Sequence, residues 1–188
     1  MSTYVPTFEN FIFDQLVTNK GSLNYCNEIG VKIVGWAARD ASLFEWTDDS
    51  LGKIYTSEKD VDGVPQCPTA CYKHQDQAKS ADTSACEGTP FDMSLWPTQN
   101  IDGGAGGDWG QRVNAENLLA TLDQDQTVIV AHEIGHGFGL PDFYEETDKP
   151  TTDFPVYIME AGSSMTVTPS DGWMLRRVLE NIKSRYSF

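Results

Sequence analysis

Alternating hydrophobic and polar positions in the first hundred residues predict short strands. Residues 31–37 alternate and are rich in β-branched side chains, which favours a strand, and residues 91–96 alternate in the same way. Residues 43–46 and 54–55 are shorter candidates on either side of an acidic turn, and a further strand is expected to begin at residues 23–25. Between residues 58 and 87 the chain is polar and carries three cysteines, which predicts a long, cross-linked surface excursion.

Apolar residues three or four apart predict helices elsewhere. Phe8, Ile12 and Leu16 indicate a short helix near the start of the chain, and Leu118, Leu119 and Leu122 indicate a second one. A C-terminal amphipathic helix is predicted from Trp173, Leu175, Val178, Leu179 and Ile182, with its start at Pro169, Ser170 and Asp171. A further helix, with Asp125 as its expected N-cap, buries Val128, Ile129, Ala131 and Ile134.

Residues 131–144, which read AHEIGHGFGLPDFY, hold the clearest candidate chemistry. His132 and His136 are four residues apart, so in an α-helix both imidazoles lie on one face, one turn apart. That spacing suits a pair of metal ligands. Glu133 follows the first histidine, where a carboxylate can accept a proton from a water held by the metal. Because this short pattern also arises by chance on soluble helices, the residues after it decide the interpretation.

Those following residues predict that the chain turns back toward the histidines. Gly139 can adopt the left-handed conformation that ends a helix, and Pro141 prevents the helix from continuing. Asp142, six residues after His136, can then supply a third ligand. Three protein ligands leave a fourth tetrahedral position for water, which is the arrangement of a catalytic zinc. The alternative for Asp142 is an ordinary turn residue after a proline.

The pattern HExxHxxGxxD over residues 132–142 resembles the zinc signature of the metzincin metallopeptidases. Most metzincins have histidine in the third position, and aspartate there resembles the snapalysin group and related secreted fungal neutral zinc proteases. The resemblance is dense over residues 127–144 and thin elsewhere. It implies one α+β domain with a twisted mixed sheet packed on the zinc helix, a C-terminal helix and a disulfide-bearing surface loop. The upper lobe would span about residues 1–137 and the lower lobe about residues 138–188.

The resemblance implies a secreted zinc endopeptidase that cleaves internal bonds of a polypeptide substrate. Zn²⁺ held by His132, His136 and Asp142 would activate the attacking water, Glu133 would be the general base, and Tyr144 would help stabilise the transition state. Two alternatives stay open. One is a secreted binding protein that zinc stabilises, and the other is a zinc hydrolase that acts on a non-peptide amide or ester.

Other stretches have roles that follow from the same resemblance. Met159 resembles the methionine turn beneath the metal, with ordinary core packing as the alternative, and residues 161–168 would shape the pocket after the scissile bond. Glu160 is a competing third ligand of the gluzincin kind, although no helical pattern surrounds it. The glycine-rich residues 102–110 would form an edge strand that pairs with the substrate backbone, or else a flexible loop. The long helix that metzincins carry after their first strand has no counterpart after Cys26. Either the N-terminal segment replaces that helix, or residues are missing between Cys26 and Asn27, which is the alternative we favour.

Composition and charge narrow the partners. The chain has 188 residues, of which 39% are hydrophobic, so one domain with a sizeable core is expected. With 13 Lys+Arg and 28 Asp+Glu the formal charge is −15, which disfavours nucleic acid and anionic membrane surfaces and favours a soluble monomer. The acidic residues also make Ca²⁺ a second candidate metal, with Asp102, Asp108, Asp123 and Asp125 as ligands, although no EF-hand spacing occurs.

The cysteines indicate an oxidising compartment. Cys26, Cys67, Cys71 and Cys86 give an even number, so we expect one disulfide among the last three and a second to Cys26. Alternatively, Cys67, Cys71, His74 and Cys86 have spacings that a structural zinc accepts. The first residues lack the basic start and apolar stretch of a signal peptide, so we expect the mature form of a secreted protein.

Overall fold

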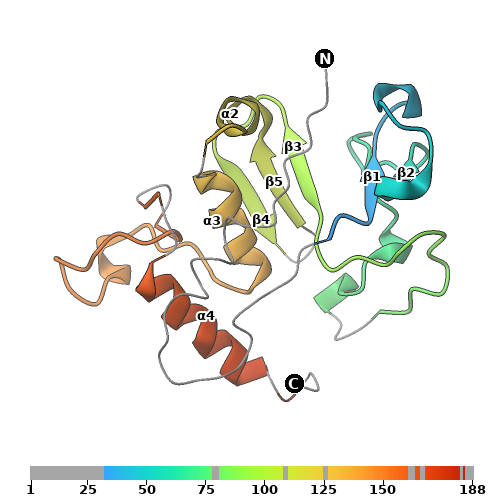
Figure 1. Ribbon diagram of the computed structural model, residues 1–188. Coiled ribbons are helices and arrows are strands. Elements are labelled where there is room, and N and C mark those ends of the chain that lie inside the picture. Colours follow the sequence, from blue (N-terminus) through green and yellow to red (C-terminus); the bar gives the residue numbers. More distant parts are fainter. Residues whose placement is uncertain are drawn as a thin grey trace. The chain divides into compact units, whose positions relative to one another are not determined.

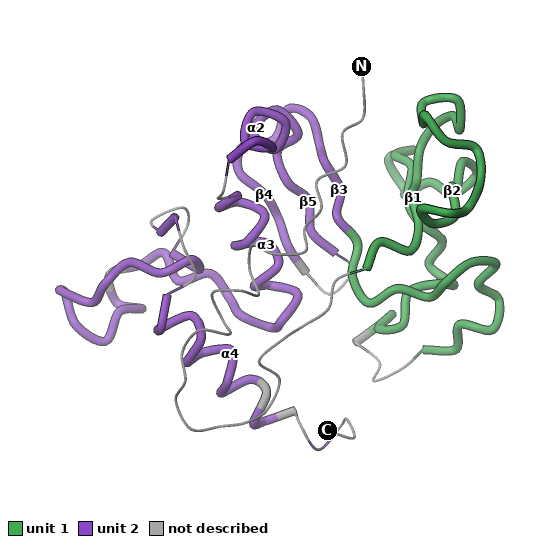
Figure 2. Tube along the Cα trace, in the orientation of Figure 1, with its two compact units in different colours: residues 1–7, 31–94 green, residues 8–30, 95–188 purple. Residues whose placement is uncertain are grey.

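The computed structural model describes residues 32–77, 81–107, 110–124, 127–160, 164–165, 168–182 and 184. The chain divides into two compact units, one formed by residues 1–7 and 31–94 and the other by residues 8–30 and 95–188 (Figure 2). The helix predicted at Phe8, Ile12 and Leu16 and the strand predicted at residues 23–25 lie outside the described residues. Helices and small mixed sheets make the protein α+β, as expected. The expected lobes on either side of residue 137 are a different division and stay a prediction.

The first unit contains a two-stranded parallel sheet. Strand β1 (Gly35–Ala37) pairs with β2 (Lys53–Tyr55). Of the strand predicted at residues 31–37, the described residues 32–37 therefore form it only over the last three positions, and the one at residues 54–55 is confirmed. The strand predicted at residues 43–46 is wrong. The Asp40 carboxylate accepts a hydrogen bond from the Ser42 amide and starts a 3-10 turn at Ala41–Leu43 instead.

A disulfide joins Cys71 to Cys86, with their Cα atoms 4.7 Å apart, so the polar excursion is cross-linked as predicted. The alternative zinc site built from these cysteines is wrong, because two of its sulfur atoms are bonded to each other. Cys67 is a free thiol, so the second bridge expected from it is not formed; Cys26 lies outside the described part of the chain. Burial raises the pKa of the Cys67 thiol to about 11, which keeps it protonated and unreactive at neutral pH.

The second unit contains a three-stranded mixed sheet in the order β3-β5-β4 (Figure 1). Strand β3 (Leu95–Thr98) runs parallel to β5 (Gly110–Asn114), and β4 (Gly104–Gly107) runs antiparallel to it. The strand predicted at residues 91–96 therefore begins later than expected, and Phe91 makes only a single bridge to Tyr72. Within the glycine-rich segment, residues 104–107 form a strand at the edge of the described sheet, and residues 108–109 lie outside the described part of the chain.

Three α-helices lie within the described part of this unit. Helix α2 (Ala115–Thr121) begins where the Asn114 side chain accepts from the Asn117 amide, and α4 (Pro169–Ile182) is the predicted C-terminal helix. Helix α3 (Val128–Gly137) has Thr127 at its N-cap, and the expected cap Asp125 lies outside the described residues. Short 3-10 turns occupy Ala41–Leu43, Asp49–Leu51, Thr69–Cys71, Gln75–Gln77 and Glu146–Asp148. No described helix is long and apolar enough to cross a membrane.

Helix α3 is the centre of the second unit because hydrophobic residues pack against it in two clusters. One cluster joins α3 to the sheet and α2 through Val113, Leu118 and Val130. The other joins α3 to the later part of the chain and to α4, and contains Ala131, Leu140, Tyr157, Ile158 and Met159 with Met174, Leu175 and Val178 around them. A helix held by two clusters presents its remaining side chains at fixed positions.

Candidate metal centre

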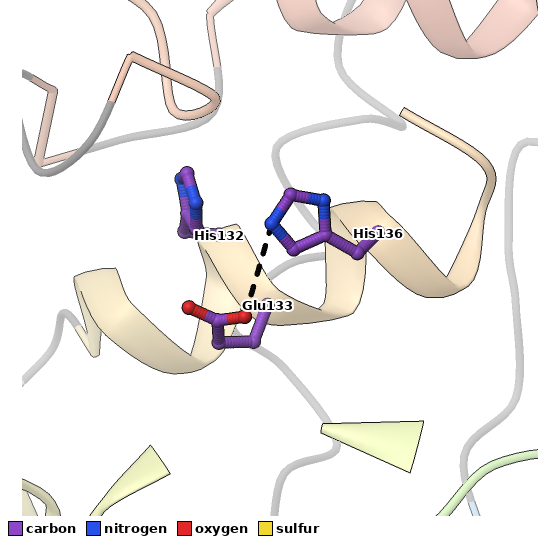
Figure 3. A group of neighbouring side chains, drawn as sticks. All are labelled: His132, Glu133 and His136. Carbon is purple, nitrogen blue, oxygen red and sulfur yellow. Dashed lines mark ion pairs between the residues drawn. The ribbon is translucent and has the colours of Figure 1, made fainter. Parts of the chain in front are cut away.

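Helix α3 carries His132, Glu133 and His136 as neighbours (Figure 3). The ligand atoms of these three side chains lie within 4.8 Å of one another, close enough to share a metal ion. His132 is 5% exposed and Glu133 is 3% exposed. The spacing four residues apart therefore places both imidazoles together, as the sequence predicts.

The end of α3 turns the chain back toward the histidines. Gly139 has a φ of 83°, and its amide donates to the His136 carbonyl at 2.8 Å, while the Leu140 amide donates to Gly135 at 3.2 Å. Asp142 follows this reversal. Its Oδ1 lies 3.0 Å from Nε2 of His132 and 3.3 Å from Nε2 of His136. The predicted helix stop and the approach of the third side chain both occur.

Backbone carbonyls orient both imidazoles. Nδ1 of His132 lies 2.8 Å from the Ile158 carbonyl oxygen, and Nδ1 of His136 lies 2.8 Å from that of Leu140. A carbonyl oxygen can only accept, so each Nδ1 carries the proton that it donates. In the neutral ring each Nε2 is then left with a lone pair, which is the atom a metal binds.

These tautomers create a conflict that a cation resolves. With neutral imidazoles, the lone pairs of two Nε2 atoms face the same carboxylate oxygen of Asp142, and three acceptors at this separation repel one another. One cation between them satisfies all three. Ligand atoms around a tetrahedral zinc with bonds of about 2.1 Å lie about 3.4 Å apart. The separations of 3.0 and 3.3 Å are close to that value, so the residues fit a zinc ion.

Glu133 lies beside these ligands without a partner for one oxygen. Its buried Oε2 accepts no hydrogen bond from the described residues and lies 3.8 Å from Nε2 of His136 (Figure 3). Burial raises the pKa of the Glu133 carboxyl, an effect that the two histidines oppose and Asp142 reinforces. A carboxyl group with a raised pKa and a free oxygen is suited to take and return a proton.

The glycines of β4 allow the strand to approach α3 closely. A Cβ at Gly104 would lie 2.6 Å from Cγ and Cδ of Glu133, and a Cβ at Gly106 would lie 2.7 Å from Cβ of His136. Neither position has room for a side chain. The sequence predicts that the bare backbone of this strand allows a substrate to approach closely. On one face of β4, however, the element that approaches closely is helix α3. Pairing of the strand's outer edge with a substrate stays a prediction.

Tyr144 lies over His132, with ring centroids 6.3 Å apart and planes at 12°, and the residue is 55% exposed. Burial and a hydrogen bond to Asp142 raise the pKa of Tyr144 to about 12. The phenol therefore remains a hydrogen-bond donor throughout the neutral range, next to the group of candidate ligands.

Met159 lies in the core against helix α3, and its role as a methionine turn beneath a metal stays a prediction. It is fully buried, and any Cβ on Gly135 of α3 would clash with its sulfur atom. The Met159 carbonyl accepts from the Phe143 amide at 3.1 Å, next to Asp142. The sequence did not indicate that Ile158 and Leu140 orient the histidines, because a backbone carbonyl has no signature in the side-chain pattern.

Other candidates from the sequence lie elsewhere. Glu160, the competing ligand, forms an ion pair of 2.7 Å with Lys149 instead. Asp102 and Asp123 belong to no metal-binding group among the described residues, and Asp108 and Asp125 lie outside them. Most of residues 161–168 is also outside, although Ser164 is buried and Met165 is 53% exposed.

Comparison with known protein families, with curated proteins and with solved structures finds no match for this chain. The fold and the site define an α+β protein with a candidate metal centre formed by two histidines, an aspartate and an adjacent buried glutamate.

Proposed function

We propose that this protein is a secreted zinc-dependent endopeptidase of the metzincin kind, similar to the snapalysin group. The observation that carries the proposal is the meeting of Nε2 of His132, Nε2 of His136 and Oδ1 of Asp142 beside the buried carboxyl of Glu133. A metal ion with two imidazole ligands and one carboxylate is typical of zinc hydrolases.

Each residue has a defined task in this proposal. His132, His136 and Asp142 would hold a zinc ion, which would supply a Lewis acid for the scissile carbonyl and for a water molecule. Glu133 accepts the proton of the attacking water and passes it to the leaving nitrogen. Tyr144 donates a hydrogen bond to the oxygen on which negative charge develops.

Exposure on one side supports a catalytic site over a structural one. The Asp142 side chain is 42% exposed and Tyr144 is 55% exposed, whereas Glu133 is 3% exposed. Solvent and substrate can therefore reach the ligands from the side of Asp142, while the base lies protected. A purely structural zinc has four protein ligands and no use for a base.

The edge strand β4 supports a polypeptide substrate. No strand within the described residues pairs with its outer edge, and an extended peptide can add to such an edge through main-chain hydrogen bonds. Secretion is supported by the Cys71–Cys86 disulfide, since such bonds persist in oxidising compartments.

The test combines metal analysis with a proteolysis assay on one sample. Purified protein is assayed on casein and on a peptide library, with and without a chelator, alongside Glu133→Gln and the control Glu116→Gln, an exposed acid on α2. We expect one zinc per chain and chelator-sensitive cleavage of internal bonds in the wild type and the control. Glu133→Gln should keep zinc and lose cleavage.

Three outcomes would contradict the proposal. A wild-type protein that holds zinc but cleaves no peptide is a zinc-stabilised binding protein. Cleavage restricted to esters or small amides makes it a hydrolase of another class. Loss of zinc from Glu133→Gln makes Glu133 a ligand, and the base is then another residue.

A further inference from the structure

Asp171 of α4 is a buried carboxylate with three donors around it. It is 1% exposed. Its Oδ1 accepts from the Ile158 amide at 2.9 Å, and its Oδ2 accepts from both the amide and the hydroxyl of Thr168 at 2.7 Å. The Asp171 amide in turn lies 3.4 Å from the Thr168 hydroxyl, so the two residues form a reciprocal cap at the start of α4. The hydrogen bond to Ile158 joins this cap to a different segment of the described chain.

The residue that Asp171 holds belongs to the turn that carries Met159. The Glu160 amide closes this turn on the Tyr157 carbonyl at 3.1 Å. Its two middle residues face the candidate ligands, because the Ile158 carbonyl accepts from Nδ1 of His132 at 2.8 Å and the Met159 carbonyl accepts from the Phe143 amide at 3.1 Å. The Ile158 carbonyl therefore orients the ligand His132 directly, and the Met159 carbonyl holds the chain at Phe143, next to the ligand Asp142.

We propose that Asp171 is a positioning residue for the metal centre: by anchoring the Ile158 amide it holds the turn that orients His132 and the segment after Asp142. The inference rests on the proposed zinc site. His136 is independent of this anchor, because its Nδ1 donates to Leu140. Asp171 therefore acts on one side of the ligand set.

A carboxylate is required here because every group around it donates. An asparagine of the same shape has one accepting oxygen and one donating nitrogen, so either the Ile158 amide or the Thr168 amide would face another donor. The plain alternative is that Asp171 serves only as a helix cap. Thr168→Val tests that alternative, since it removes the capping hydroxyl and leaves the bond to Ile158 in place.

The experiment measures zinc affinity of the apo-protein by competition with a chromophoric chelator, and the visible spectrum of the cobalt-substituted protein. Asp171→Asn and Thr168→Val are both expected to melt at a lower temperature than the wild type. Thr168→Val should keep the wild-type zinc affinity and cobalt spectrum. Asp171→Asn should bind zinc about 10- to 100-fold more weakly, the usual effect of losing a residue that supports a ligand, and its cobalt bands should shift.

The proposal is overturned if Asp171→Asn binds zinc as tightly as Thr168→Val does. Should Asp171→Asn fail to fold, hydrogen exchange on the wild type decides. Zinc must then increase protection of the Ile158 and Thr168 amides more than that of the Asn117 amide, which donates to the Asn114 cap of α2. Equal changes at all three amides refute the anchor. A wild type that binds no zinc instead refutes the metal centre itself.

Discussion

Replacing Gly104 with alanine tests the placement of the base. Side chains alternate along a strand, so Gly104 and Gly106 present the same face of β4 to α3, while Ala105 lies on the other face and is exposed. A Cβ at Gly104 would lie 2.6 Å from Cγ and Cδ of Glu133 and closer still to Oε1. The carboxyl group must therefore move.

Gly104→Ala should lower the rate of turnover more than it lowers the stability of the fold. The atoms that a Cβ at Gly104 meets belong to one rotatable side chain, so the overpacking should cost near the lower end of its usual range, about 1 kcal/mol. A base displaced by about 1 Å loses about 100-fold in rate. No hydrogen bond of His132 or His136 to its carbonyl involves Gly104, so zinc should stay bound.

Gly106→Ala should behave differently. Its Cβ would lie 2.7 Å from Cβ of His136 and 2.8 Å from the Glu133 carbonyl oxygen, which belongs to the backbone of α3. Since a backbone atom and a ligand's Cβ cannot rotate away, we expect a stability loss near the upper end, about 3 kcal/mol, and weaker zinc binding.

The assays are peptide turnover, zinc content and urea denaturation. Ala105→Ser is the control, and it should match the wild type in all three. We expect Gly104→Ala to keep zinc and lose kcat, and Gly106→Ala to lose both. Full turnover in Gly104→Ala would show that the carboxyl group pressed against β4 is not the base. Loss of zinc in Gly104→Ala would mean that Glu133 binds the metal.

Three further predictions follow from other contacts. Tyr144→Phe should keep zinc and lose turnover by the loss of an oxyanion donor, about 2.7 to 4 kcal/mol, and because the pKa of Tyr144 is raised to about 12, the wild-type rate should show no decline from this phenol near neutral pH. Lys149→Met leaves the Glu160 carboxylate, whose side chain is 13% exposed, unpaired and should cost about 3 kcal/mol of unfolding free energy in a urea melt, most of which a double variant with Glu160→Met recovers. Burial opposes the lowering of the pKa of Asp92, but hydrogen bonds from its two basic neighbours outweigh it. Asp92→Asn should therefore be less stable than the wild type above pH 3.8, by less than about 1 kcal/mol, and the difference should vanish as the pH falls through the lowered pKa.

Each of these has a control or a contrary result. Wild-type turnover in Tyr144→Phe removes the phenol from the mechanism. Lys53→Met breaks an ion pair in which Glu87 is 78% exposed, so it should cost little, and an equal cost for Lys53→Met and Lys149→Met would contradict the burial argument. A stability difference for Asp92→Asn that persists at pH 2 would assign its cause to packing.

The candidate site could be predicted from the sequence because its pattern is local. The positions of His132, Glu133 and His136 follow from the helical period, and the return of Asp142 follows from a glycine and a proline that permit few conformations. The structure of the glycine-rich residues 102–110 is harder to predict from the sequence. Their composition fits both a loop and an edge strand, and only the close approach to α3, which the sequence does not disclose, favours the strand.

Features that depend on distant contacts could not be predicted. The residues at 43–46 have strand-forming side chains, yet a single hydrogen bond from Ser42 to Asp40 starts a 3-10 turn before them. The carbonyls of Ile158 and Leu140 orient the histidines without any sequence signal. For Asp171 the sequence does contain a signal, because Thr168 and Asp171 have the spacing of a capping box. That pattern does not disclose the hydrogen bond to the Ile158 amide.

The central claim is that His132, His136 and Asp142 together hold one zinc ion with a coordination position left for water. X-ray absorption of the zinc-loaded protein measures this directly. We predict four-coordinate zinc with two imidazole nitrogens and two oxygens at about 2.0 to 2.2 Å. A shell that contains sulfur, or six oxygens without imidazole, would contradict it.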